Sequence, residues 1–402
     1  MIDRCVVVAL AAMYAFFPLY GTYAVFAPHP PTAPLVPRAV AILFAAIMLL
    51  AMATAAAGAA RRRAPQPLRG PLLANAAATY VGAALGFNPA VGLGLATGVA
   101  GLVATHFALI AYYRDRNVAR VIYLALLVSG LMSSLVAIVL VLVRAPADLY
   151  AYNHGRAVGT FLNPNELAAF LLAYLGAACG LAMVRRGTPL GTFAAVCAVV
   201  GAVALTLTFS RWGLAAALAG IVFFALAMRE RRGVAAALGV LAVAAAINAA
   251  AWNRHHDPQD TGVRGVAWRA GIRTFLHFPL TGVGPLAFER LYPVMRAPDA
   301  PGPDTPVAYD PHDLALSIAA ETGALGLGAI VFGFVRLGGV LARALASADR
   351  RRRTLTVALA AGIVAVVVHS LLNSVSIAFS IIAQFAALAI AAANWEFEPH
   401  AS

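Results

Sequence analysis

The chain consists largely of long apolar stretches separated by short polar segments. An α-helix needs roughly 20 mainly apolar residues to cross the hydrocarbon core of a bilayer, and about twelve stretches of the 402-residue sequence approach that length. The pattern predicts an all-α polytopic membrane protein with about twelve transmembrane helices. The predicted spans cover residues 5–26, 36–60, 72–87, 90–113, 120–143, 165–184, 190–208, 212–228, 233–251, 312–340, 354–372 and 376–394.

Two polar segments are longer than ordinary connections between packed helices. We predict a single integral membrane domain over residues 1–402, with a short external segment at 144–164, a long external loop at 252–311 and the final three spans within 312–394. The long loop is rich in proline, but its residues 263–277 lack proline and predict a short helix at the membrane surface. Its interfacial anchors would be Trp268, Phe275 and Phe278.

Composition and charge support this interpretation. Hydrophobic residues make up 62% of the chain and charged residues 11%, whereas a soluble domain is about a quarter charged. The net charge of +13 comes from arginine alone, because the chain has no lysine. Arginine groups recur between alternate spans, so the positive-inside rule explains them better than nucleic-acid binding and places both termini in the cytoplasm. The predicted inside arginines are Arg4, Arg61, Arg62, Arg63, Arg69, Arg114, Arg116, Arg120, Arg185, Arg186, Arg229, Arg231, Arg232, Arg343 and Arg350 to Arg353.

Arginines on the external side run against the positive-inside rule and need a separate explanation. A guanidinium group offers a planar fork of donors that matches phosphate oxygens, so a phosphate-rich ligand is one explanation. The alternative is that these arginines bind lipid headgroups or pair with acidic residues of the same loop. The external set is Arg144, Arg156, Arg211, Arg254, Arg264, Arg269, Arg273, Arg290 and Arg296.

Two of these arginines have a distinctive local sequence. Arg211 lies in the very short turn 208–213 between two apolar spans, where a charge so close to the membrane is costly and is usually functional. Arg156 lies just before a segment of tight turns and a helix start. Asn163 or Asn165 is expected to cap that helix, and Asn165 is also a candidate for substrate binding.

His312 is the candidate general base. The sequence Asp310-Pro311-His312-Asp313 predicts an N-cap, a proline at the first helical position and a histidine in the first turn of the tenth span. This places His312 at the external boundary of the membrane, with Tyr309 and Asp313 as neighbouring candidates for substrate binding. An ordinary interfacial histidine is the alternative.

Other polar residues of the spans are interpreted as structural. His369 and Asn373 lie four residues apart and are expected to pack or form hydrogen bonds, and Glu321 is an intramembrane charge without an identified partner. His255 and His256 are adjacent in a loop and lack the spacing of metal ligands. We predict neither a metal site nor a cofactor.

Three stretches together resemble the O-antigen ligase and polymerase superfamily of bacterial membrane glycosyltransferases. They are Arg156 with the following 159–168, then Ser210-Arg211-Trp212-Gly213, then His312 leading into Glu321-Thr322-Gly323 and Gly326. The loop carrying Arg264, Trp268 and the run 279–284 is also similar, so the resemblance covers roughly residues 150–375. The superfamily's turn has glycine directly after its arginine, whereas this chain has Trp212 first.

The resemblance implies a C-type glycosyltransferase fold and an inverting, metal-independent reaction. Its functional positions fall on Arg211, Arg264 and His312, although Arg269 competes with Arg264 because the local register is ambiguous. The implied protein lies in the inner membrane of a Gram-negative bacterium, with its active site facing the periplasm.

The implied reaction is that of an O-antigen ligase, which transfers glycan from undecaprenyl pyrophosphate to lipid A-core. An O-antigen polymerase or a protein O-oligosaccharyltransferase of the same superfamily would share every residue named so far. A transporter for an anionic solute is the alternative from another class. It is disfavoured because few ionisable residues are buried in the spans and the two halves show no symmetry.

Overall fold

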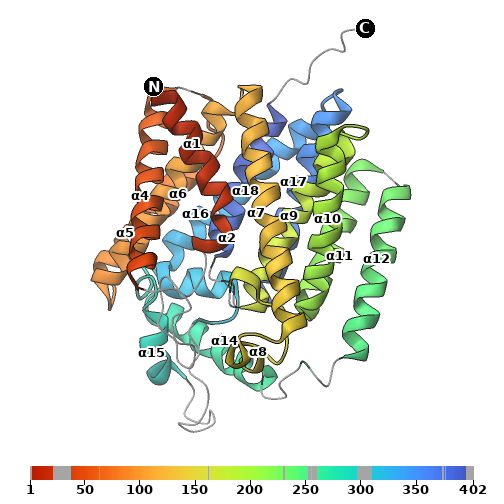
Figure 1. Ribbon diagram of the computed structural model, residues 1–402. Helices are drawn as coiled ribbons and strands as arrows, with labels where there is room; N and C mark the ends of the chain where they lie inside the picture. The colour runs from red at the N-terminus through yellow and green to blue at the C-terminus, as the bar shows by residue number, and fades with distance from the viewer. Residues whose placement is uncertain are drawn as a thin grey trace.

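The computed structural model describes a bundle of α-helices (Figure 1). It describes residues 2–20, 38–62, 64–161, 163–229, 231–251, 255, 260–296, 310–373, 375 and 377–394, and no strand occurs within them. The helices are α1 (Ile2–Ala15), α2 (Phe17–Tyr20), α4 (Arg38–Arg61), α5 (Arg69–Leu85), α6 (Pro89–Tyr112), α7 (Arg116–Val143), α8 (Ala147–Tyr152), η1 (Gly159–Phe161), α9 (Pro164–Val184), α10 (Pro189–Leu207), α11 (Arg211–Met228), α12 (Arg231–Ala250), α14 (Asp260–His277), α15 (Phe288–Met295), α16 (Leu314–Leu345), α17 (Arg350–Ser370) and α18 (Ala378–Ala393).

The architecture is that of an all-α polytopic membrane protein. Within the described residues, eight helices are long and apolar enough to cross a membrane: α6, α7, α9, α10, α11, α12, α16 and α17. Helices also occupy the other predicted spans, but α1, α5 and α18 have only 14, 17 and 16 residues. The structure thus confirms the class of fold, while the count of about twelve spans stays a prediction.

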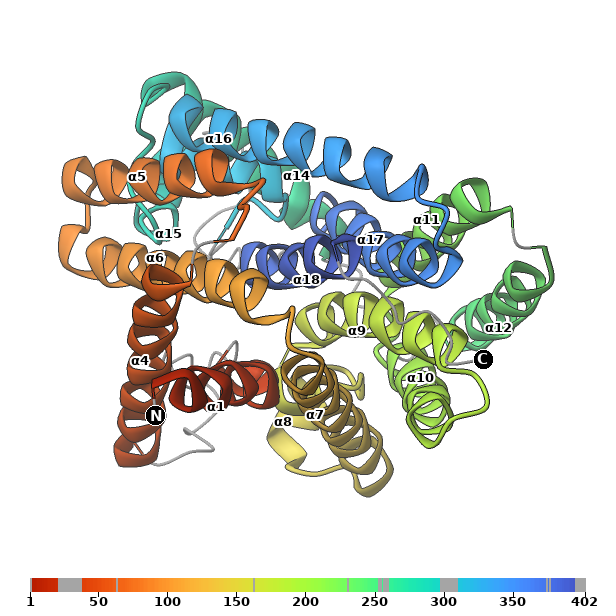
Figure 2. The ribbon, with the colours of Figure 1, turned by 90° about the horizontal axis from the view of Figure 1, so that it is seen from above.

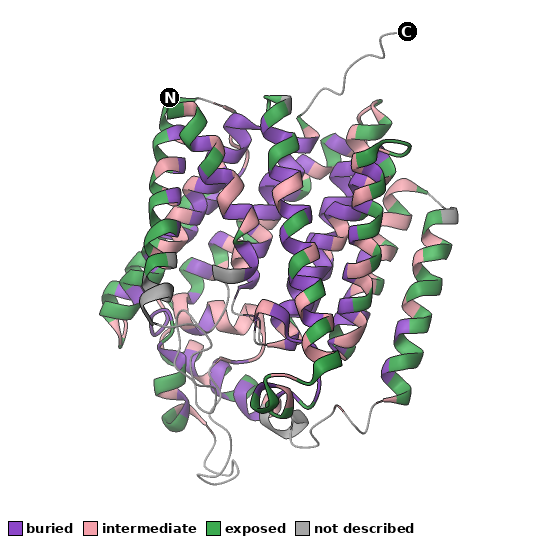
Figure 3. Cartoon of the chain, viewed as in Figure 1, coloured by how far each residue is buried: buried purple, intermediate pink, exposed green. Residues whose placement is uncertain are grey.

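Helices α9 and α17 form the centre of the bundle (Figures 2 and 3). Glycine allows their backbones to meet, because a Cβ atom on Gly176 would lie 2.6 Å from the carbonyl oxygen of Ala358, and one on Gly362 would lie 3.0 Å from the Cα atom of Ala173. Small residues permit this close contact between helices in membranes, where packing rather than water exclusion drives association. Helix α11 approaches α17 in the same way at Gly220.

The long loop is tied to a break in α16. Gly323 has φ 64° and ψ −161°, which interrupts the helix, and the segment 279–284 fills the gap. Backbone hydrogen bonds run from Val283 N–H to Ala320 O (2.9 Å) and from Ala324 N–H to Pro279 O (2.8 Å). Carbonyl and N–H groups freed by the break are therefore satisfied by the loop, as a membrane interior requires.

The loop also contains the predicted surface helix. The structure confirms a helix there, α14, which begins at Asp260 rather than at residue 263. Val266, Ala267 and Ala270 of α14 pack with Phe288 of α15 and Ala320 of α16. In Figure 1, α8, α14 and α15 lie together at the lower end of the bundle, opposite the start of α1.

Candidate active site

A small cavity with a volume of about 30 Å³ lies where α9, α11, α14 and the end of α17 meet. Four residues predicted from the sequence line it together: Arg156, Asn165, Arg211 and Arg264. The arginines come from three separate parts of the chain, so the fold itself assembles them. The other lining residues are Phe209, Ser210, Trp212, Asn248, His255 and Asn373.

The turn before α11 presents Arg211 to this cavity. Phe209 adopts a left-handed backbone conformation, with φ 49°, and Ser210 then caps α11 by accepting a hydrogen bond from the Gly213 N–H (3.1 Å). Arg211 is consequently the first residue of the helix. The positive end of the helix dipole points to the same place, which adds to the attraction for an anion.

Asn165 joins the segment that carries Arg156 to this turn. Its Oδ1 atom accepts hydrogen bonds from Arg156 Nη2 (3.1 Å) and from the Ser210 hydroxyl (3.2 Å). Arg156 Nε also donates to the Thr208 carbonyl (2.8 Å). The cap of α9 is Asn163, which accepts from the Asn165 N–H (2.8 Å). Asn163 is thus the capping residue, and the side chain of Asn165 is free to organise the two arginine-bearing segments.

His369 contacts the turn before α11. Its side chain is fully buried at the end of α17, and its Nε2 atom lies 3.2 Å from the Ser210 hydroxyl oxygen. Asn373 donates to the His369 carbonyl (3.4 Å) and also lines the cavity. The expected hydrogen-bonding role of both residues is confirmed, whereas the position of Asn373 at the cavity was missed.

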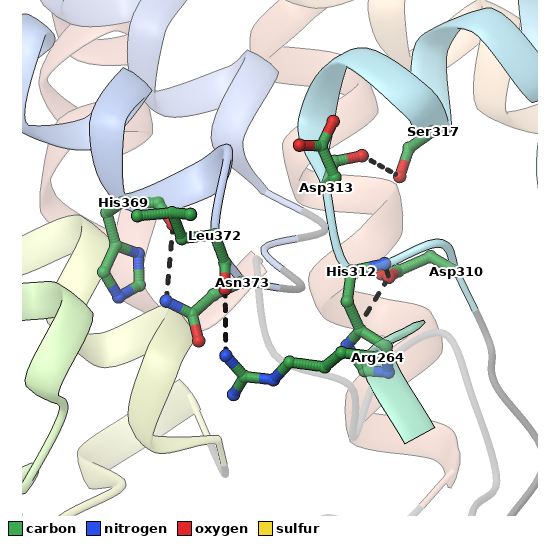
Figure 4. A network of polar contacts seen from close by, with 8 residues as sticks. All are labelled: Arg264, Asp310, His312, Asp313, Ser317, His369, Leu372 and Asn373. Atoms are coloured by element: carbon green, nitrogen blue, oxygen red, sulfur yellow. Dashed lines mark hydrogen bonds and ion pairs between the residues drawn. The ribbon is translucent and has the colours of Figure 1, made fainter. Parts of the chain in front are cut away.

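Arg264 enters the cavity from α14. Its Nη1 atom donates to the Leu372 carbonyl (3.1 Å), so the guanidinium is held against the end of α17 (Figure 4). Arg269 is exposed and Arg273 is partly exposed on the same helix, and neither is among the residues that line the cavity. Of the two competing positions, the geometry places Arg264 with Arg156 and Arg211.

The predicted start of α16 is wrong. The helix begins at Leu314 and is capped by Asp313, whose carboxylate accepts from the Leu316 N–H (2.8 Å). Asp310 instead accepts from the His312 N–H (2.6 Å) and lies 3.8 Å from His312 Nδ1. His312 therefore precedes the helix, with φ 55°, rather than lying in its first turn.

Within the described part of the chain, His312 is not one of the residues that line the cavity. The segment that carries it nevertheless packs on α14, because a Cβ atom on Gly271 would lie 3.0 Å from the Pro311 ring. Figure 4 shows His312 and Asp310 on the segment before α16, with Arg264 on α14. The same helix thus supports the histidine segment and carries the cavity arginine.

The remaining predicted residues have other positions. The Asp313 carboxylate caps α16. Burial raises the pKa of this carboxyl above its usual value, although the backbone N–H donors of Leu316 and Ala315 act in the opposite direction. Tyr309 lies outside the described residues. Glu321 does have a partner, because its Oε1 atom accepts from the Leu286 N–H (3.0 Å) and ties the long loop to α16.

Several lining residues had no signal in the sequence. His255 stacks on Phe209, with ring centroids 3.9 Å apart and planes 13° apart, and its Nδ1 atom lies 2.6 Å from the His154 carbonyl oxygen. Asn248 on α12 donates to the Thr206 carbonyl (3.2 Å). Both residues lie far along the chain from the residues that they contact, so only the three-dimensional contact reveals them.

The cavity is suited to an anion. Three arginines line it, and no aspartate or glutamate does so within the described part of the chain. Guanidinium groups bind phosphate oxygens through paired donors, and their attraction is stronger where water is partly excluded. The arrangement therefore fits a ligand that carries one or more phosphates.

The fold and this cationic cavity define a polytopic α-helical membrane protein with an anion site at one end of its bundle. The family model described as O-antigen ligase matches residues 196–332, about a third of the chain. The match confirms the resemblance to the O-antigen ligase superfamily and supports an enzyme. Arg211, Arg264 and His312 lie inside the matched range, whereas Arg156 and Asn165 lie before it. Among curated proteins, no sequence matches the chain significantly.

Replacing Asn165 with leucine should destabilise the protein. The change leaves Arg156 and Ser210 without their shared acceptor, and a buried donor without a partner costs about 1–3 kcal/mol. The measurement is thermal unfolding in detergent, with Asn88→Leu as control, because Asn88 is an asparagine at the start of a helix that makes no capping hydrogen bond. Equal unfolding temperatures for wild type and Asn165→Leu would show that the shared acceptor does not stabilise the contact between the segments of Arg156 and Ser210.

Proposed function

We propose that the protein is an O-antigen ligase. It transfers glycan from undecaprenyl pyrophosphate to a sugar hydroxyl of lipid A-core on the periplasmic face of the inner membrane. The observation that carries the proposal is the convergence of Arg156, Arg211 and Arg264 on one cavity. The match to the O-antigen ligase family supports the same class of reaction.

The arginines hold the pyrophosphate of the donor. As the glycosidic bond breaks, negative charge grows on the leaving pyrophosphate, and donors that are already in place stabilise that charge. Arg211 contributes its guanidinium together with the N-terminal end of α11. Arg264 and Arg156 are held by the carbonyls of Leu372 and Thr208, which reduces the reorganisation needed when the donor binds.

His312 is the proposed general base. The acceptor hydroxyl oxygen attacks the anomeric carbon, the bond from that carbon to the pyrophosphate oxygen breaks, and the proton of the hydroxyl passes to His312. The configuration at the anomeric carbon is inverted, because the displacement occurs in one step. The segment that carries His312 packs on α14, and α14 also carries Arg264 of the cavity. This shared helix supports a proton transfer from an acceptor at the cavity to His312.

Two other acceptors fit the same residues. A polymerase would use a second lipid-linked glycan as acceptor, and a protein O-oligosaccharyltransferase would use a serine of a pilin. The ligase is preferred because the loop 252–311 is short for a protein-recognition domain. All three activities share the donor and the arginines, so the acceptor alone distinguishes them.

A transfer assay in detergent tests this proposal. The purified chain receives undecaprenyl-pyrophosphate glycan with lipid A-core, with lipid-linked repeat alone or with pilin, in each case with EDTA present. We expect product with lipid A-core, and a turnover lowered by about 10²–10³ in Arg211→Ala and Arg264→Ala, the usual effect of removing one stabilising donor. The matched control is Arg269→Ala, because Arg269 lies on the same helix but does not line the cavity.

Each acceptor gives a different conclusion. Product only with the lipid-linked repeat would indicate a polymerase, and product only with pilin would indicate a protein oligosaccharyltransferase. An Arg269→Ala variant as impaired as Arg264→Ala would contradict the assignment of the pyrophosphate to this cavity.

His312→Ala separates a base from a residue that only orients the acceptor. Loss of a general base lowers turnover by about 10²–10⁴ with little change in the apparent KM for lipid A-core. Loss of an orienting contact raises that KM more than it lowers turnover, and this result would contradict the proposed role. His277→Ala is the control, because His277 is an exposed histidine at the end of α14.

A further inference from the structure

A second cavity lies at the other end of the helices that form the candidate active site. Its volume is about 370 Å³, which is within the usual range for small-molecule sites. Helices α9 and α17 run from one site to the other: Asn165 and His369 lie at the active-site end, and Leu181 and Leu355 line the second cavity. The full lining is Asn117, Arg120, Tyr123, Leu181, Val184, Arg185, Thr188, Pro189, Leu190 and Leu355.

The second cavity has a polar rim and an apolar interior. Asn117, Arg120 and Thr188 are exposed, whereas the Leu181 and Leu355 side chains are buried. Its lining includes two arginines and, within the described residues, no aspartate or glutamate. The cavity is thus amphipathic and positively charged at its mouth.

We propose that this cavity binds one anionic phospholipid of the membrane. Its phosphate lies at Arg120 and Arg185, which offer paired guanidinium donors, and its acyl chain lies along Leu181, Val184 and Leu355. Basic pockets between membrane helices on the arginine-rich side are suited to such headgroups. A zwitterionic lipid is less favoured because its cationic group would face the two arginines.

The proposal is independent of the transfer reaction. The cavity joins α7, α9, α10 and the start of α17, so a lipid bound there stabilises the central helices without contacting the donor. A ligand that binds only the folded state raises its stability. Binding should therefore appear as lipid-selective stabilisation as well as a lipid retained by the protein.

The test uses the full chain, purified in a neutral detergent and freed of lipid. Binding is measured by native mass spectrometry and thermal unfolding, with phosphatidylglycerol, phosphatidylcholine of the same acyl chains, or glycerol phosphate. Wild type should bind phosphatidylglycerol about tenfold more tightly than phosphatidylcholine. A tenfold ratio of dissociation constants is what the loss of one charge-assisted hydrogen bond produces. The double variant Arg120→Gln, Arg185→Gln should lose this preference.

A matched control removes the same charge nearby. The variant Arg114→Gln with Arg186→Gln changes two exposed arginines, one just before α7 and one beside Arg185, that do not line the cavity. This variant should keep the preference. Equal loss in both double variants would show a general surface attraction and overturn the proposal. If the variant lacking Arg185 does not fold, the single Arg120→Gln change at an exposed position carries the same test.

The apolar wall gives an independent test. Leu190→Trp narrows the cavity while both arginines remain, and it should weaken phosphatidylglycerol binding as the arginine changes do. Unchanged binding by Leu190→Trp would overturn the assignment of the lipid to this cavity. Equal stabilisation by glycerol phosphate and phosphatidylglycerol would identify a simple phosphate site, which also overturns the lipid proposal.

Discussion

The close contact of α9 with α17 determines where the candidate active site forms. Glycines at 176 and 362 let the two backbones meet, and the contact brings both Asn165 and His369 within hydrogen-bond distance of the Ser210 hydroxyl. That hydroxyl donates to Asn165 and accepts from the Gly213 N–H, so its second lone pair is satisfied when His369 donates from Nε2. A buried polar group in a membrane protein needs such partners, and here they fix the turn that presents Arg211.

The helices were largely predictable from the sequence because hydrophobic length and arginine position are local signals. The convergence of the side chains on the cavity was not predictable from the sequence. Arg264 and Arg269 were both predicted to be external and lie on one helix, and only the packing of α14 decides that Arg264 faces the cavity. His255 and Asn373 come from distant segments. The start of α16 was misplaced because both Asp310 and Asp313 suit a cap, and the backbone uses Asp313.

The stretch Glu321-Thr322-Gly323, which resembles the superfamily, has a structural role in this chain. Gly323 breaks α16, and Gly282 approaches so closely that a Cβ atom there would lie 2.3 Å from the Glu321 carbonyl carbon. Glu321 in turn accepts from the Leu286 N–H. These contacts anchor the long loop to the bundle, and the anchored loop carries α14, which positions Arg264 and supports the segment of His312.

The proposed reaction depends on binding of the donor pyrophosphate in the arginine cavity. The most direct measurement is equilibrium binding of undecaprenyl pyrophosphate, without any acceptor, to wild type and to Arg211→Gln. Wild type is expected to bind undecaprenyl pyrophosphate at least about tenfold more tightly than undecaprenol, and Arg211→Gln is expected to lose most of this difference. Equal affinity of the wild-type chain for the pyrophosphate and the alcohol would show that the cavity does not bind the pyrophosphate.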